Sequence, residues 1–175
     1  MILIKNYFEF LIGKDQTPLG QLPYLVVDDF KIPQSISMAR FLARRFNLAG
    51  KDELEQLKSD VIMDTLCDLR NGFNQKVYSV EENERPGVIA KFIDDAKVHL
   101  NRIEKLINEY GGSSGFSVGS NITWADFELY EVTSKMLSNY PNVLDSYRAI
   151  LAVRNNVENH HVIGPYLKNR PVTSF

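Results

Sequence analysis

Gln34 and Ser35 precede a run of apolar residues that recur at helical spacing, so they introduce an amphipathic helix. The first amides of a helix have no acceptor within the helix, and the helix dipole places partial positive charge at the same end. A carboxylate bound at this end is therefore stabilised. On these residues alone, Ser35 is interpreted as a helix cap.

Thr123 and Asp126 have the spacing of a capping box at the start of a second helix. In such a box the side chain of each residue bonds the backbone amide of the other. Ile122 and Phe127 have the spacing of a hydrophobic staple around it. The role predicted for this motif is structural and not catalytic.

Asp60, Asp64 and Asp68 recur every four residues and form an acidic stripe on one helix face. A solvated surface explains such a stripe as well as a ligand does. Cys67 lies between two of these acids and is interpreted as a small packing residue, not as a nucleophile. No metal site is predicted, because none of the histidines has ligand spacing with acids or cysteine. No permanently bound cofactor is predicted either.

The elements that position these residues change in kind near residue 48. Before it, two short apolar runs at 24–27 and 30–32 flank Asp28 and Asp29, which predicts a β-hairpin. The helix opened by Gln34 and Ser35 follows. Beyond residue 51 the period is helical. Helices are predicted over residues 52–74, 88–110, 124–139, 143–158 and 161–168.

Apolar spacing also predicts which helix faces are buried. In the first long helix the inward positions are expected to be Leu54, Leu57, Val61 and Leu69. In the second, spacings of three and four residues predict the seam of a helix pack. Its members are Ile89, Phe92, Ala96, Leu100, Ile103 and Ile107.

Composition excludes several classes of protein. The net charge of -2 gives no attraction to nucleic acid or anionic lipid, and 44% hydrophobic residues suffice for a sizeable core. No apolar run reaches the roughly 18 residues of a membrane span. A single cysteine excludes an internal disulfide, which favours a reducing, cytoplasmic setting. Residues 1–6 lack a basic leader and a cleavage site, so no signal peptide is predicted.

Three strings together resemble glutathione transferases of the sigma type: Gly20-Gln21-Leu22-Pro23, Gln34-Ser35 and Thr123-Trp124-Ala125-Asp126-Phe127. The resemblance implies an α+β, mostly α fold. A thioredoxin-like domain would span residues 1–46, a linker 47–51, and an all-helical domain 52–175. It also implies a homodimer that uses glutathione as co-substrate. The reaction would be conjugation to a hydrophobic electrophile or isomerisation of a prostaglandin-like substrate.

The same resemblance implies a set of glutathione contacts. In the family the proline matching Pro23 is cis. The backbone of the residue matching Leu22 pairs with the cysteinyl residue of glutathione, as one added strand would. Gln21 would lie beside the same ligand. Gln34 and Ser35 match the pair that binds the γ-glutamyl carboxylate.

Two further contacts follow from the resemblance. Lys14 matches a lysine that contacts the glycyl carboxylate. Asp68 matches an aspartate at the dimer interface, which reaches the γ-glutamyl amino group bound by the neighbouring subunit. Phe10 stands where sigma enzymes often carry a tryptophan that contacts the ligand, and this departure weakens the contact expected there.

One departure concerns catalysis itself. The family begins with a βαβ unit whose first strand ends in a catalytic tyrosine, and an Arg-Gly-Arg-Ala-Glu motif opens its first helix. Neither is found in this sequence. Tyr7 lies only 14 residues before Gln21, too close for a helix and a strand to intervene. We therefore expect a truncated thioredoxin-like domain with no assigned catalytic residue, and Tyr7 is a poor candidate. The alternatives are a non-catalytic glutathione-binding or structural relative of the S-crystallin type, and an incomplete form of a working enzyme.

Overall fold

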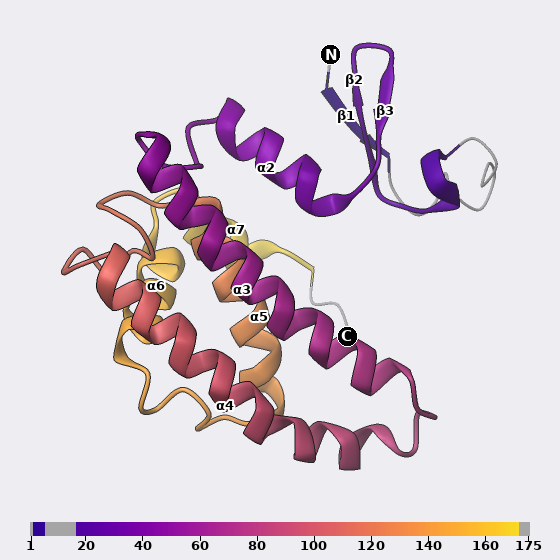
Figure 1. The fold of residues 1–175 in the computed structure, drawn as a ribbon, viewed down its shortest axis with the longest axis vertical. Helices are drawn as coiled ribbons and strands as arrows, with labels where there is room; N and C mark the ends of the chain where they lie inside the picture. Colours follow the sequence, from indigo (N-terminus) through magenta and orange to yellow (C-terminus); the bar gives the residue numbers. More distant parts are fainter. Residues whose placement is uncertain (1, 6–16, 172–175) are drawn as a thin grey trace. The chain divides into compact units, whose positions relative to one another are not determined.

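The computed structural model describes residues 2–5 and 17–171 of the chain. The chain divides into two compact units, Met1–Leu48 and Ala49–Phe175. In the described residues, the first unit combines a small sheet with one α-helix, and the second is helical (Figure 1). This agrees with the predicted mostly α, α+β fold, in which a thioredoxin-like domain precedes a helical domain.

The first unit is built on a three-stranded antiparallel sheet of order β1-β2-β3. Its strands are β1 (Ile2–Lys5), β2 (Tyr24–Val27) and β3 (Phe30–Ile32). Leu25 pairs with Ile32, and Val27 pairs with Phe30. The bounds of the predicted hairpin are therefore confirmed residue for residue.

Two helical segments flank this hairpin. The short 3-10 helix η2 (Pro18–Gly20) precedes β2, and α2 (Ser35–Arg45) follows β3. Helix α2 buries Met38 and Ala43. An antiparallel hairpin places the residues before its first strand and those after its second strand at the same end. The segments 22–23 and 33–35 therefore lie at one end of the hairpin.

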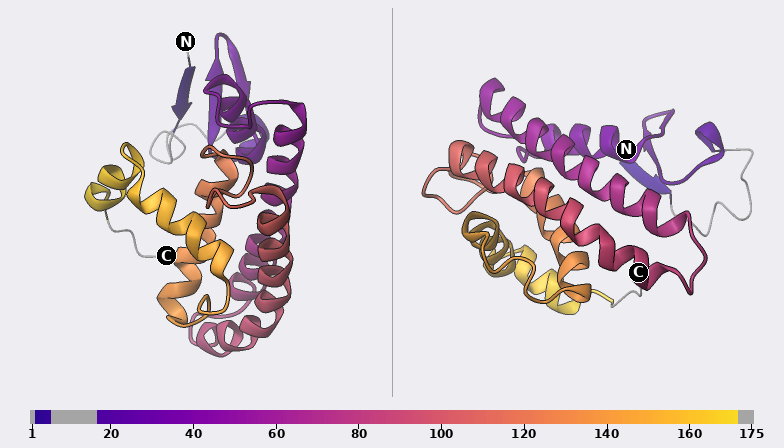
Figure 2. Two further views of the ribbon diagram at one scale, coloured as in Figure 1. Left: turned by 90° about the vertical axis from the view of Figure 1, so that its left-hand side faces the viewer. Right: turned by 60° about the horizontal axis from the view of Figure 1, so that its bottom comes forward.

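The second unit contains five α-helices, and its described residues include no strand. They are α3 (Glu53–Tyr78), α4 (Arg85–Tyr110), α5 (Trp124–Asn139), α6 (Arg148–Asn159) and α7 (Ile163–Asn169). The long helices α3 and α4 run side by side, and α5 packs along α3 (Figures 1 and 2). Helix α6 packs on both α4 and α5.

The core of the second unit lies between these helices and confirms the predicted seam of α4. Five of its six positions are buried, and Ile89 is half-buried. The buried members are Phe92, Ala96, Leu100, Ile103 and Ile107. Ile62, Leu66 and Leu69 of α3 and Leu129 of α5 belong to the same cluster.

The inward face predicted for the start of α3 was wrong. Leu54 and Leu57 are 61% and 60% exposed. The buried stripe instead consists of Ser59, Ile62 and Leu66, each 0% exposed. Because Ser59 is not apolar, a prediction based on apolar spacing does not place it on the buried face. The predicted buried face of α3 therefore lay about one position away from the observed one.

Three helix bounds also differ from the prediction. Helix α3 continues to Tyr78 instead of ending near residue 74, because Phe73 packs edge-on against Phe92 at 5.3 Å between ring centroids and Val77 is buried. Helix α4 begins at Arg85, three residues before the predicted start, with proline in its first turn. Helix α6 begins at Arg148 and not near residue 143, because residues 141–146 form turns.

Candidate functional site

The segment that leads into β2 carries the backbone implied by the sequence motif. The peptide bond between Leu22 and Pro23 is cis, as the resemblance implied. Gln21 is extended, with φ -131 and ψ 157, and its side chain is exposed. Leu22 is half-buried and lies before the first paired residue of β2, Tyr24. Its backbone amide and carbonyl are thus outside the ladder formed by the three strands.

The start of α2 differs from the cap predicted on the residues alone. Gln34 is the N-cap residue and makes no side-chain capping bond, whereas Ser35 is the first helical residue. The first helical hydrogen bond runs from the Met38 amide to the Gln34 carbonyl at 3.0 Å. The amides of the three intervening residues therefore have no acceptor within the helix. Both side chains, Gln34 and Ser35, are exposed.

The backbone conformation of Gln34 could not be predicted from the sequence. Its φ is 74 and its ψ 101, a region that residues other than glycine rarely adopt. Such conformations cost on the order of 1–3 kcal/mol and gather at ligand sites. Gln34 lies two residues after β3 and therefore near the end of the hairpin at which Leu22 and Pro23 lie. The structure thus places five of the predicted contact residues, at positions 21–23 and 34–35, near one end of the hairpin in one unit.

The remaining predicted residues are not joined to this group. Lys14, Phe10 and Tyr7 lie outside the described residues. Asp68 is exposed on α3 of the second unit, as is Asp64. Cys67 beside them is half-buried, and burial raises the pKa of its thiol. A thiol whose pKa is raised holds less thiolate at neutral pH, which agrees with a packing role.

The predicted capping box at α5 is confirmed and is buried. The Asp126 carboxylate accepts from the Thr123 amide at 2.6 Å and from the Thr123 hydroxyl at 2.9 Å. It also accepts from the Ser117 amide at 2.8 Å, a contact outside the box. Asp126 and Ser117 are both 0% exposed. Burial raises the pKa of Asp126, and these hydrogen bonds oppose the shift. The carboxylate therefore ties the loop before α5 to the helix.

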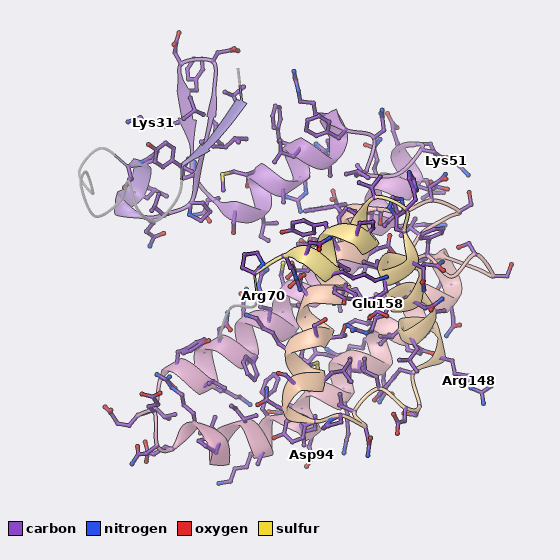
Figure 3. All side chains as sticks on the ribbon, turned by 180° about the vertical axis from the view of Figure 1, so that it is seen from behind. Lys31, Lys51, Arg70, Asp94, Arg148 and Glu158 are labelled. Atoms are coloured by element: carbon purple, nitrogen blue, oxygen red, sulfur yellow. The ribbon has the colours of Figure 1, made fainter. Side chains whose placement is uncertain are left out.

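The second unit holds a cavity of about 200 Å³ between α3, α4 and α5. Its walls are largely apolar, with Leu69, Phe92 and Val132 among them. At its edge Arg70 of α3, labelled in Figure 3, donates to Glu128 of α5 at 2.5 Å. Burial raises the pKa of Glu128, and the positive charge of Arg70 opposes the shift. This ion pair joins residues 58 positions apart, so no local motif could have indicated it.

A second cavity of about 340 Å³ adjoins the first, since Phe73, Glu131 and Lys135 line both. Arg85 of α4 and Arg170 beyond α7 also line the second cavity. No cluster of His, Cys, Asp and Glu suited to a metal ion occurs in the part of the chain that the structure describes. Within that same part, no helix has the length and apolar character needed to cross a bilayer.

Comparison with known proteins gives a consistent result. Residues 67–170 match the family model described as glutathione S-transferase, C-terminal domain. The chain is 31% identical over 163 residues to mouse hematopoietic prostaglandin D synthase, covering 93% of this chain and 79% of that protein. It is 33% identical to the probable glutathione S-transferase 8 of Caenorhabditis elegans, with 95% and 82% covered. The structure matches a monomeric glutathione S-transferase of the hookworm Necator americanus with a TM-score of 0.84, at 29% identity and with 97% and 83% covered.

Proposed function

Because the chain belongs to the glutathione S-transferase family, we propose that it is a sigma-type glutathione transferase. Its reaction would be conjugation of reduced glutathione to hydrophobic electrophiles, or isomerisation of prostaglandin-like substrates. The family supplies the class of reaction. The choice of ligand contacts rests on the geometry of the first unit.

The end of the hairpin is the observation that supports glutathione binding most directly. There Leu22 has a backbone amide and carbonyl outside the ladder, next to the cis bond to Pro23. A peptide ligand would pair with them as one added strand rung. The uncapped start of α2, at Gln34 and Ser35, would hold the γ-glutamyl carboxylate. Gln21 and Lys14 would complete the contacts in this subunit.

Thiol activation is the chemical step that remains to be supplied. A free cysteine thiol has a pKa of about 8.5, so glutathione is mostly protonated at neutral pH. A hydroxyl that donates to the sulfur would favour the thiolate, which attacks the electrophile. None of the contacts proposed above donates to the sulfur. We therefore expect the polypeptide of residues 1–175 to bind glutathione and to conjugate it slowly.

Tyr7→Phe tests this expectation. Turnover of glutathione with 1-chloro-2,4-dinitrobenzene should be slow in the wild-type polypeptide and the same in Tyr7→Phe, while calorimetry shows glutathione binding in both. A collapse of turnover in Tyr7→Phe would show that Tyr7 is the activating hydroxyl. Binding with no turnover above the uncatalysed rate would favour the S-crystallin type of relative. Absence of glutathione binding would contradict the proposed function.

We also propose a two-fold homodimer in the cytoplasm, with a role in detoxification. Asp68 would then serve the glutathione bound by the neighbouring subunit, and the exposed Leu54 and Leu57 offer apolar surface on the same helix. Sedimentation equilibrium should give twice the chain mass of 20.0 kDa. A species of 20.0 kDa only, at concentrations up to 100-fold above those of the activity assay, would contradict the dimer. The hookworm relative described as monomeric shows that this outcome exists in the family.

A further inference from the structure

Three consecutive backbone amides at the start of α7 bond to a single residue, His160. The amides of Val162 and Ile163 donate to Nδ1 of its ring at 3.3 and 3.4 Å. The Gly164 amide donates to its carbonyl oxygen at 2.8 Å. Val162, the N-cap residue of α7, has no side-chain acceptor of its own. The ring of His160 therefore acts as the cap that a serine or aspartate supplies at other helix starts.

The role of acceptor determines the protonation state of His160. A ring nitrogen accepts a hydrogen bond only when it carries no proton, so the ring is neutral and its proton lies on Nε2. An imidazolium donates from both nitrogens and accepts at neither. Protonated Nδ1 would meet the amides of Val162 and Ile163 donor against donor and leave both without this acceptor. Imidazoles gain this second proton between about pH 8 and pH 5.

Few other contacts hold α7 in place. Gly164 is the buried residue of this seven-residue helix. A Cβ atom at Gly164 would lie only 2.4 Å from the carbonyl oxygen of Glu158, so α7 packs closely on the end of α6. Beyond the other end of α7, Arg170 donates to Glu131 of α5 at 2.5 Å. A helix this short depends strongly on its ends, so loss of the cap should loosen it.

The immediate surroundings of His160 oppose a positive charge on its ring. The ring of His161 lies against it, with 4.5 Å between centroids, so charge on one ring disfavours charge on the other. The start of α7 also disfavours a cation, through its dipole and the amides that bond Nδ1. The end of α6 favours a cation, but through its dipole alone. The direct bonds from α7 therefore decide the sign.

The charged groups on the neighbouring elements have other partners or lie further along α7. The carboxylates that bond α6 or the end of α7 are Glu104 with the amides of Ala149 and Ile150, Glu131 with Arg170, and Glu158 with Arg154. The titratable residues of α7 itself, Tyr166 and Lys168, lie beyond its first turn. The ring of His160 is therefore the group whose protonation acts directly on the start of α7.

We propose that His160 is a pH-sensitive cap that controls the attachment of α7. The neutral ring holds α7 on the end of α6. Protonation removes the cap, so α7 loosens and Arg170 separates from Glu131. Because attached α7 requires the neutral ring, the proton binds more tightly to the loosened form, and the loosened population grows as pH falls. This device uses no glutathione and no residue of the first unit, so it goes beyond the proposed conjugation reaction.

Hydrogen exchange of the full chain without glutathione tests this cap. Protection factors of the α7 amides, corrected for the intrinsic pH dependence of exchange, are measured at about pH 8 and about pH 5, the limits between which imidazoles change charge. The α6 amides are the reference for any change in global stability. We expect α7 protection to fall about tenfold at the lower pH, because two hydrogen bonds to the ring are lost. Protection of α6 should stay the same.

His160→Asn is the decisive variant. The side-chain oxygen of asparagine accepts from backbone amides at either pH, so α7 protection should be the same at both. His161→Asn removes the neighbouring imidazole and should leave the fall in place. Unchanged α7 protection in the wild type, or an equal fall in His160→Asn, would overturn the proposal. A fall that His161→Asn abolishes would also overturn it, because the switch would then lie in the other ring.

Nitrogen NMR of the wild-type imidazole rings keeps the proposal testable if His160→Asn folds poorly. At the higher pH, His160 should carry its proton on Nε2 and none on Nδ1. Its protonation should follow the same pH dependence as the loss of α7 protection. A proton on Nδ1 at the higher pH, or protonation without loss of α7 protection, would overturn the proposal.

Discussion

Asp126→Ala is expected to lower the free energy of unfolding of the helical unit by about 3 kcal/mol or more. The carboxylate is 0% exposed and accepts from the Thr123 amide, the Thr123 hydroxyl and the Ser117 amide. Alanine leaves these buried donors without an acceptor, and each such group costs about 1–3 kcal/mol. Urea denaturation followed by helical circular dichroism measures the loss. Trp124, the only tryptophan and the first residue of α5, reports the same transition by fluorescence.

Asp52→Ala is the matched control for this loss. Asp52 is the N-cap residue of α3, and its carboxylate accepts from the Glu55 amide at 2.8 Å, so it also accepts a backbone amide at a helix start but in an exposed setting. Water can replace the lost acceptor there, so we expect about 1 kcal/mol, the usual value for a cap. Equal losses in the two variants would show that burial adds nothing to the cap of α5.

The effect of Asp126→Ala on stability should also depend on pH. Burial raises the pKa of Asp126 in the folded state above that of the unfolded chain. The folded protein then binds this proton more readily, so the contribution of Asp126 to stability falls as pH rises through the window between the two pKa values. The difference in stability between wild type and Asp126→Ala should therefore widen as pH is lowered from neutrality into that window. Denaturation midpoints at several pH values measure this difference.

Ser35→Asp is expected to reduce the affinity for glutathione by about 100-fold or more, the equivalent of roughly 2.7 kcal/mol. Ser35 is the first residue of α2 and is exposed beside amides that have no acceptor within the helix. A carboxylate built into the chain at this position would take the place proposed for the γ-glutamyl carboxylate and repel it. The same charge favours the helix dipole and should stabilise α2 by about 0.3–1 kcal/mol. Loss of binding without loss of stability is the expected combination, measured by calorimetry and thermal denaturation.

Ser37→Asp provides the charge control. Ser37 is exposed in the same first turn, two residues further along and so about 200° around the helix. It adds the same charge away from the proposed carboxylate position, and we expect less than about tenfold loss of affinity, since an exposed charge is screened by water and salt. Similar losses of glutathione affinity in both variants would show that the added negative charge, and not its position at Ser35, causes the loss. Wild-type affinity in Ser35→Asp would show that the carboxylate binds elsewhere.

Local signals in the sequence determined several elements of this protein with their ends. The hairpin of β2 and β3 follows from two apolar runs around Asp28 and Asp29, and Asp28 has the positive φ of 53 that such a turn uses. Helix α5 begins and ends at the predicted residues, because Thr123 and Asp126 cap its start. These features depend only on residues within a few positions of one another, so they can be predicted from the local sequence.

The α6 region shows what only the tertiary structure decided. Its helix begins at Arg148 because the carboxylate of Glu104, on α4, accepts from the amides of Ala149 and Ile150 at 2.8 and 2.9 Å. This cap comes from 45 residues away, so no capping residue appears in the local sequence. Arg154 is another case. It is 8% exposed, and its guanidinium donates to Thr133 of α5 at 2.6 Å.

The candidate sites divide in the same way. The motifs around Leu22 and Ser35 were visible in the sequence, because each depends on a short segment of backbone. The positive φ of Gln34 and the ion pair of Arg70 with Glu128 were not. Each of these depends on which helices pack together and how deeply a side chain is covered. Packing of distant segments sets those quantities, and a side chain has the same sequence signature whether or not a neighbour covers it.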